Sequence, residues 1–327
     1  MATPTPRPAP DSLAVSIVTP TLNQARFLQR TLDSVAAQSY PVREHIVIDG
    51  GSTDGTLDIL SRAGNHGPIR WKSEPDEGMY DAVNKGLALT TGDIIGYLPS
   101  DDVYLPWAFE AVVKAFATRP ATDLVFGDGI TFEEDTGNQI LRLYAPFDRV
   151  SLANYASLFQ PAVFWSRRLY ERLGGFDAGM RYVADLDYWL RAAAAGATIA
   201  HVDEILSVER VHKDRLSTAS REAMQAEEQA MRAGHAGADF GPEARQRAQE
   251  RYERWQRTLW KRFLVASTFS VLPGPWHRFL RMGRVTVDRR RVLSGLSRQI
   301  ELRTAMTSGL AADVVRVDQF AKAVTPD

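Results

Sequence analysis

Residues 13–38 read LAVSIVTPTLNQARFLQRTLDSVAAQ and join two kinds of hydrophobic pattern. The first eight residues form a mostly apolar, β-branched run that stops at Pro20, which is typical of a buried strand. From residue 25 onward, apolar residues recur at helical spacing on one face: Phe27, Leu28, Leu32 and Val35. The stretch therefore predicts a buried strand followed by an amphipathic helix.

The same alternation continues to residue 128. Strand patterns are expected at 44–49, 69–74, 92–98 and 122–128, and helix patterns at 55–63, 79–87 and 106–117. Apolar strands separated by amphipathic helices predict an α/β fold, with a mainly parallel sheet covered by helices on both faces. Beyond residue 128 the pattern weakens to a hairpin over 130–144, with its turn near Thr136 and Gly137, and then to short helices and a strand.

Acidic side chains follow several of the predicted strands. In such sheets the ligand crevice lies beyond the carboxyl ends of the strands, so the polar clusters at 49–54, 74–77 and 100–102 are candidate site residues. The last cluster ends in the adjacent pair Asp101 and Asp102. Two neighbouring carboxylates repel each other unless a cation or donors lie between them, which favours a metal–diphosphate site. An exposed pair that caps the next helix is the alternative.

Composition limits the chemistry. The 327-residue chain has no cysteine, which excludes disulfides, thiolate metal sites and cysteine nucleophiles. The net charge is −1, yet residues 231–327 hold 18 basic against 9 acidic side chains. We expect residues 1–12, with four prolines in the first ten, to be a disordered lead-in and not a signal peptide. No apolar stretch approaches the ~20 residues of a membrane-spanning helix.

Four motifs in order resemble family 2 glycosyltransferases, and together they cover about two-thirds of the chain. They are VSIVTPTLNQARFLQRTLDSVAAQ, HIVIDGGSTDGT, SEPDEGMYDAVNKGLALTTGDIIGYLPSDD and GGFDAGMRYVADLDYWLRAAAAG. The resemblance implies a GT-A, Rossmann-like fold and an inverting enzyme that transfers a sugar from a nucleotide-diphosphate sugar, with a UDP-sugar as the first expectation. It also implies a divalent metal, Mn²⁺ or Mg²⁺.

The resemblance assigns roles residue by residue. The nucleotide-binding positions that it implies are Thr19, Pro20, Thr21, Asp49, Asp81, Lys85 and Asp101. Asp102 would bind the metal, and His212 is a second candidate ligand. Three departures or alternatives stay open: Ser100 replaces the first acid of the usual metal motif, Asp49 can equally form an Asx-turn, and Lys85 can lie on a solvated helix face.

An acceptor hydroxyl needs a base, and by resemblance Asp185 is that base. The acid that usually precedes it is replaced by Ala184, and a helix N-terminus alone would also favour an aspartate here. Expected acceptor-binding positions are Gln160, Gly174, Gly175 and Asp187.

The expected organisation is a catalytic domain over 13–218, divided into a nucleotide half at 13–128 and an acceptor half at 129–218, followed by a basic helical extension at 219–327. Arginines alternate with aromatic residues over 251–284, which suits a membrane surface, the protein's own catalytic domain or a second subunit. We expect a cytoplasmic enzyme of polysaccharide or glycolipid synthesis that does not bind nucleic acid. A sugar nucleotidyltransferase and a non-catalytic sugar-nucleotide-binding protein are the alternatives.

Overall fold

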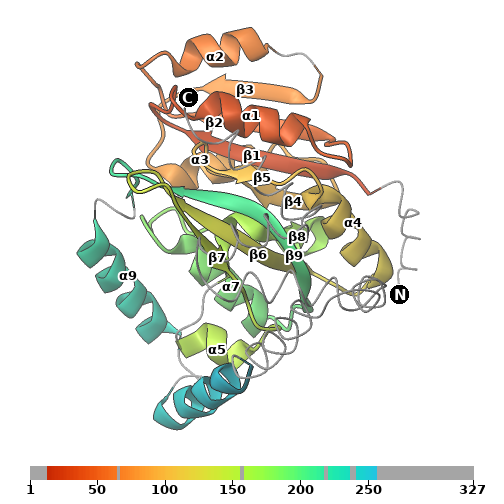
Figure 1. Ribbon diagram of the computed structural model, residues 1–327, viewed down its shortest axis with the longest axis vertical. Coiled ribbons are helices and arrows are strands. Elements are labelled where there is room, and N and C mark those ends of the chain that lie inside the picture. Colours follow the sequence, from red (N-terminus) through yellow and green to blue (C-terminus); the bar gives the residue numbers. More distant parts are fainter. Residues whose placement is uncertain (1–12, 65–66, 155–157, 217–219, 236–240, 256–327) are drawn as a thin grey trace, which may run out of the picture. The chain divides into compact units, whose positions relative to one another are not determined.

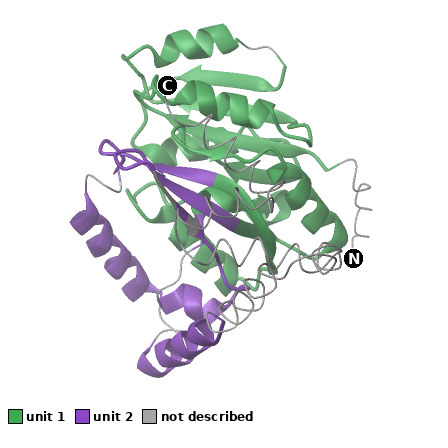
Figure 2. Ribbon diagram, in the orientation of Figure 1, with its two compact units in different colours: residues 1–127, 160–207 green, residues 128–159, 208–327 purple. Residues whose placement is uncertain are grey.

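The computed structural model describes residues 13–64, 67–154, 158–216, 220–235 and 241–255 (Figure 1). The chain divides into two compact units, shown in Figure 2. The first unit comprises residues 1–127 and 160–207, and the second comprises 128–159 and 208–327. Each unit is described by itself.

The sheet has a parallel half and an antiparallel half. Its strand order is β3-β2-β1-β4-β8-β6-β9-β5. The strands are β1 (Val15–Thr21), β2 (Glu44–Asp49), β3 (Ile69–Ser73), β4 (Ile94–Tyr97), β5 (Val103–Tyr104), β6 (Leu124–Glu133), β8 (Val163–Ser166) and β9 (Ile199–Val211). Strands β1 to β4 pair in parallel, whereas β8 runs antiparallel to both β4 and β6.

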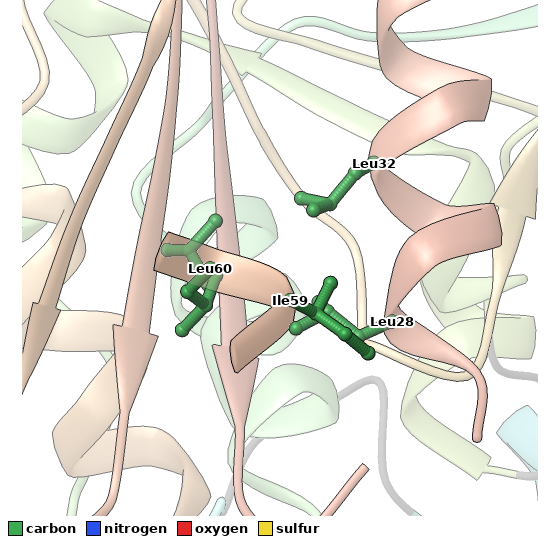
Figure 3. Packing of buried hydrophobic residues seen from close by; sticks show 5 residues of the cluster. Leu28, Leu32, Ile59 and Leu60 are labelled. Atoms are coloured by element: carbon green, nitrogen blue, oxygen red, sulfur yellow. The ribbon is translucent and has the colours of Figure 1, made fainter. Parts of the chain in front are cut away.

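Helices cover both faces of the parallel half. They are α1 (Leu28–Ala36), α2 (Thr56–Ala63) and α3 (Met79–Leu87). Val47 of β2 belongs to a cluster of buried residues with Leu28, Leu32, Ile59 and Leu60 of α1 and α2, and Figure 3 labels these four. Ile46 and Ile48 pack with Ala82 of α3. Successive residues of a strand face opposite sides, so the uninterrupted apolar run of β2 serves two layers of helices.

Helix α3 packs very close to β1. A Cβ atom on Gly86 would lie 2.3 Å from Cγ1 of Val18, which is well inside van der Waals contact. A glycine here lets the helix backbone approach the sheet, and this approach sets the position of the site residues on α3.

Most predicted elements of the first half are confirmed, and β2 and α3 have the predicted bounds. The predicted inward stripe of α1 is buried along its whole length. The strand expected at 122–128 forms as β6 but continues to Glu133, and its neighbour β8 is antiparallel to it. Strands β5 and β8 were not predicted, because two and four residues are too few to show a period.

The remaining helices of the first unit are α4 (Ala108–Thr118), α6 (Arg167–Leu173) and α7 (Ala184–Ala194). The second unit contains the predicted hairpin, in which the end of β6 pairs with β7 (Asn138–Arg142) and Gly137 takes the left-handed backbone of the turn at φ 68°. It also contains α5 (Arg149–Asn154) and α9 (Arg221–Gly234), and residues 242–255 are helical.

No helix among the described residues is both long and apolar enough to cross a membrane. The basic and aromatic segment predicted at 251–284 lies outside the described residues beyond position 255. Its expected membrane or subunit contact stays a prediction, as do the domain boundaries drawn from the sequence.

Candidate active site

The carboxyl ends of β1, β2 and β3 bring three polar residues side by side. Thr21 is paired in register with Asp49, which is paired with Ser73. Asp49 is fully buried, and its carboxylate accepts hydrogen bonds from the backbone N–H groups of Gly51 and Ser52, both at 3.0 Å. The hydroxyls of Ser52 and Ser73 donate to the same carboxylate. The Asx-turn, which was one of the alternatives for Asp49, is therefore formed, and it fixes Asp49 at the carboxyl end of β2.

A second carboxylate lies over this turn. A Cβ atom on Gly50 would come within 2.5 Å of Oδ2 of Asp76, so the absence of a side chain at Gly50 is what allows Asp76 to approach. Oδ1 of Asp76 accepts a hydrogen bond from the N–H of Gly78. Burial raises the pKa of Asp76, and the nearby charge of Asp49 adds to this effect.

The exposed face of α3 carries an ion pair. Nζ of Lys85 lies 2.9 Å from Oδ2 of Asp81, one turn earlier, and also donates to the carbonyl of Pro75 at 3.0 Å. The hydrogen bond from Lys85 lowers the pKa of Asp81. The structure thus brings together two predicted nucleotide-binding residues.

The turn that carries the aspartate pair is held from α1. Oγ1 of Thr31 lies 2.8 Å from the carbonyl oxygens of both Ser100 and Asp102, so its single proton is shared between them. Asp102 is 1% exposed, whereas Asp101 is partly exposed. Thr31 is itself buried in the core, which makes the turn a rigid extension of the sheet.

Asp185 lies in the first turn of α7. Its Oδ1 accepts two hydrogen bonds, one from the N–H of Leu186 at 2.8 Å and one from the hydroxyl of Tyr80 on α3 at 3.2 Å. The positive end of the α7 dipole favours an ionised carboxylate at this position. The side chain of Asp185 is partly exposed.

A buried tyrosine connects the two acidic positions. Tyr97, the last residue of β4, is 1% exposed. Burial raises its pKa well above the ordinary value, and the charges of both Asp185 and Asp102 raise it further. These two aspartates, 83 positions apart in the sequence, thus act on the same side chain.

The GGFD loop is fixed to α3 by a pair of hydrogen bonds. Nδ2 of Asn84 donates to the carbonyl of Phe176 at 2.8 Å, and the N–H of Phe176 donates to Oδ1 of Asn84 at 2.9 Å. A Cβ atom on Gly175 would lie 2.3 Å from Oδ1 of Asn84, so this contact requires glycine. Arg191 binds the carbonyl of Gly175 at 2.9 Å and the carboxylate of Asp187 at 2.7 Å.

Comparison with known proteins identifies the family. The family model described as "Glycosyl transferase family 2" matches residues 16–173 of the chain. An uncharacterised glycosyltransferase of Mycobacterium tuberculosis is 37% identical over 182 residues, which are 55% of this chain and 68% of the relative. The chain belongs to glycosyl transferase family 2. A PGL/p-HBAD biosynthesis glycosyltransferase of Mycobacterium bovis is 35% identical over 187 residues, or 56% of this chain and 71% of that protein.

Solved structures of glycosyltransferases share the fold. A mannosyltransferase from Pyrobaculum calidifontis, solved with GDP-Man and Mn²⁺, matches 97% of this chain and 82% of its own, with a TM-score of 0.54 and 20% identity. TarS of S. aureus matches 95% of this chain and 53% of its own, with a TM-score of 0.53 and 15% identity. The predicted GT-A fold is confirmed.

Within this family 2 glycosyltransferase, several predicted site residues have structural partners of their own. The hydroxyl of Thr19 contacts Nε2 of the buried His45 at 2.8 Å, and Pro20 is buried beside it in β1. Nε2 of Gln160 donates to the backbone carbonyl of Tyr97 at 3.0 Å. His212 follows β9 in the second unit, where it is buried, and its metal role stays a prediction.

Sequence reasoning missed the residues that hold the site together: Thr31, Tyr80, Tyr97 and Phe176. Tyr97 lies in an apolar run, where a core position is the ordinary interpretation, whereas Thr31, Tyr80 and Phe176 each have a charged neighbour in the sequence. One usable signal existed for Tyr80, which shares the inward face of α3 with Val83 and Leu87 but carries a hydroxyl that needs a partner when buried.

Proposed function

We propose that this family 2 glycosyltransferase is an inverting enzyme that transfers a sugar from a nucleotide-diphosphate sugar to an acceptor hydroxyl, with Asp185 as the base. The observation that supports this proposal is the hydrogen bond at 3.2 Å from Tyr80 on α3 to the carboxylate of Asp185, because the same helix carries the Asp81–Lys85 pair. An inverting transfer needs a site for the departing diphosphate and a base for the acceptor within one site.

The reaction is a single displacement. The acceptor oxygen attacks the anomeric carbon from the side opposite the diphosphate, a new C–O bond forms, and the bond to the diphosphate oxygen breaks with its electron pair. The acceptor proton passes to the carboxylate of Asp185, and the nucleoside diphosphate leaves. Because Oδ1 of Asp185 already accepts hydrogen bonds from Leu186 and Tyr80, the carboxylate is held in one orientation for this step.

A divalent cation fits the aspartate pair in its chemistry. Carboxylate oxygens at Asp101 and Asp102 are hard ligands of the kind that Mg²⁺ and Mn²⁺ prefer. Among the described residues, no group of three or more His, Cys, Asp or Glu side chains is arranged to hold a metal ion. Diphosphate oxygens of the donor would complete the ligand set. When bound, the cation would neutralise charge on the diphosphate.

The nucleotide would lie along the carboxyl ends of β1, β2 and β4, near Thr21, Asp49 and Asp101. The Asp81–Lys85 pair borders this edge from α3. A UDP-sugar remains our first choice of donor, and a GDP-sugar is the second, since the mannosyltransferase of similar fold was solved with GDP-Man. The name of the relative in PGL/p-HBAD biosynthesis supports a glycolipid acceptor.

The donor is testable without knowledge of the acceptor. Thermal unfolding of the full chain with UDP-, GDP- and dTDP-sugars, each with and without Mn²⁺, is expected to show stabilisation by one nucleotide class, and more strongly with Mn²⁺. If no nucleotide raises the melting temperature in either condition, the proposed function is wrong.

The base is tested with Asp185→Asn, which keeps the side-chain volume but removes the carboxylate. Release of nucleoside diphosphate in the presence of the selected donor is expected to fall by 10²-fold or more, as is common for a general base. Asp33→Asn, an exposed acid on α1 that accepts a hydrogen bond from Gln29, is the matched control and is expected to retain activity. Full turnover by Asp185→Asn would exclude this residue as the base.

A further inference from the structure

The two sides of α3 have different partners. Its exposed side carries the Asp81–Lys85 pair, whereas Tyr80 and Asn84 point to the loop and helix that carry the base. The ring of Tyr80 is 2% exposed and stacks on Phe176 with ring centroids 5.7 Å apart. Its hydroxyl lies 3.2 Å from two acceptors, the carbonyl of Tyr182 and Oδ1 of Asp185.

A second tyrosine extends this contact into the sheet. Tyr97 is buried at the end of β4, and burial first, then the nearby Tyr80 and Asp185, raise its pKa well above the ordinary value. The hydrogen bond from Tyr80 on α3 reaches Asp185 on α7, and Tyr97 of β4 interacts with both residues. Three elements that are distant in the sequence meet at one carboxylate.

We infer that Tyr80 is a positioning residue for Asp185: its hydroxyl favours the ionised carboxylate and holds it in the orientation needed to accept a proton. This inference rests on the proposed function of Asp185 as the base. A hydrogen bond to the ionised form of a carboxylate stabilises that form, and a donor from a different element also restrains its rotation.

Packing alone does not require the hydroxyl of Tyr80. A phenylalanine at this position would keep the stacked ring, since the contact with Phe176 involves only the ring. Tyr188, on α7 beside Asp185, provides the comparison: its ring packs on Phe176 at 4.8 Å, but among the described residues its buried hydroxyl has no hydrogen-bond partner. The two tyrosines occupy the same aromatic cluster and differ in whether the hydroxyl reaches the carboxylate.

The charged and titratable groups around the carboxylate come from three elements. Tyr80 faces it from α3, and the charge of Asp185 raises the pKa of Tyr97 on β4, as does the charge of Asp102. On α7, Asp187 forms an ion pair with Arg191 at 2.7 Å. Of these groups, Tyr80 donates a side-chain hydrogen bond to Asp185 at 3.2 Å, so we remove its hydroxyl.

The experiment compares Tyr80→Phe with Tyr188→Phe in the full chain. Aspartate carboxyls are labelled with ¹³C, and the Asp185 resonance is assigned by its loss in Asp185→Asn. The pKa of Asp185 is expected to rise by about one unit in Tyr80→Phe, because the ionised form loses a donor, and to stay at the wild-type value in Tyr188→Phe. An unchanged titration of Asp185 in Tyr80→Phe would overturn the inference.

Turnover separates this inference from the proposed function. With the donor selected by thermal unfolding, Tyr80→Phe is expected to release nucleoside diphosphate about 10-fold more slowly. The acid limb of its pH–rate profile should move to higher pH, and the nucleotide should raise its melting temperature as much as it does for the wild type. If Tyr80→Phe has the turnover rate and the pH–rate profile of the wild type, the inference about Tyr80 is wrong and the proposed function is not affected. Full turnover in Asp185→Asn would instead contradict the proposed base, whatever Tyr80→Phe does.

Discussion

Replacement of Asn84 by alanine should loosen the loop that leads to the base. The side-chain amide of Asn84 makes two hydrogen bonds to the backbone of Phe176, at 2.8 and 2.9 Å, and these bonds fix the loop to α3. Phe176 is 5% exposed, so its N–H and carbonyl have little access to water once the amide is removed.

The expected loss of stability follows from these two bonds. Each is worth about 1 kcal/mol net, and a buried backbone group left without a partner costs about 1–3 kcal/mol. Asn84 is half-buried, so water replaces part of the loss, and the higher helix propensity of alanine offsets about 0.5 kcal/mol. We therefore expect Asn84→Ala to lower the free energy of unfolding by about 2 kcal/mol.

Urea unfolding at equilibrium, followed by tryptophan fluorescence, measures this difference. The matched control is Gln29→Ala on α1, whose amide is exposed and makes a single hydrogen bond to Asp33 at 2.9 Å. The control is expected to stay within about 0.5 kcal/mol of the wild type. If Asn84→Ala is as stable as Gln29→Ala, the loop does not depend on the amide, and our account of how α3 holds the GGFD loop is wrong.

Three further predictions test the core, the pH dependence and the aspartate turn. Leu32 of α1 is 2% exposed and packs in the cluster with α2, so Leu32→Ala should lower the free energy of unfolding by about 2–5 kcal/mol. Leu89→Ala, at an exposed position, should lower it little. Similar urea midpoints for the two variants would contradict the packing in Figure 3. Burial lowers the pKa of His45 to about 3, from an ordinary value near 6.5. Between these two values the unfolded chain binds a proton that the folded chain does not, so stability falls as pH drops from about 6.5 toward 3, by about 2 kcal/mol between pH 7 and pH 5. Urea unfolding of His45→Gln at both pH values should show a smaller difference, and an equal one would show that His45 is not the group responsible. Thr31→Val removes the hydroxyl shared by the carbonyls of the 100–102 turn and should reduce the melting-temperature shift produced by nucleotide with Mn²⁺; a wild-type shift would mean that the turn does not need Thr31.

The parallel half of the fold was predictable because each of its elements has a local period. Strand β2 and helix α3 are long enough to show alternation or helical spacing, and their bounds were predicted correctly. Strands β5 and β8 contain only two and four residues, and they form because longer neighbours pair with them. No period within such short segments distinguishes a strand from a loop.

The site residues also divide into those that the sequence predicts and those that only the folded chain reveals. The position of Asp102 after β4 follows from the chain itself, since a strand delivers the next residues to its own carboxyl end. Some hydrogen-bond partners of Asp49 were predictable, because Gly51 and Ser52, which close its turn, follow it directly in the sequence. Ser73, which donates to the same carboxylate at 2.7 Å, comes from another strand and could not be identified in advance.

The sequence by itself determined the alternation of strands and helices, the family, and the acids that end the strands, because these depend on residue type at short spacing. Only the tertiary structure decided that Tyr80 forms a hydrogen bond with Asp185, and that Asn84 holds Phe176. These contacts join residues up to 105 positions apart, at distances set by the packing of α3 against the sheet. A hydrogen bond depends on tenths of an ångström, and no periodicity along the chain encodes that distance.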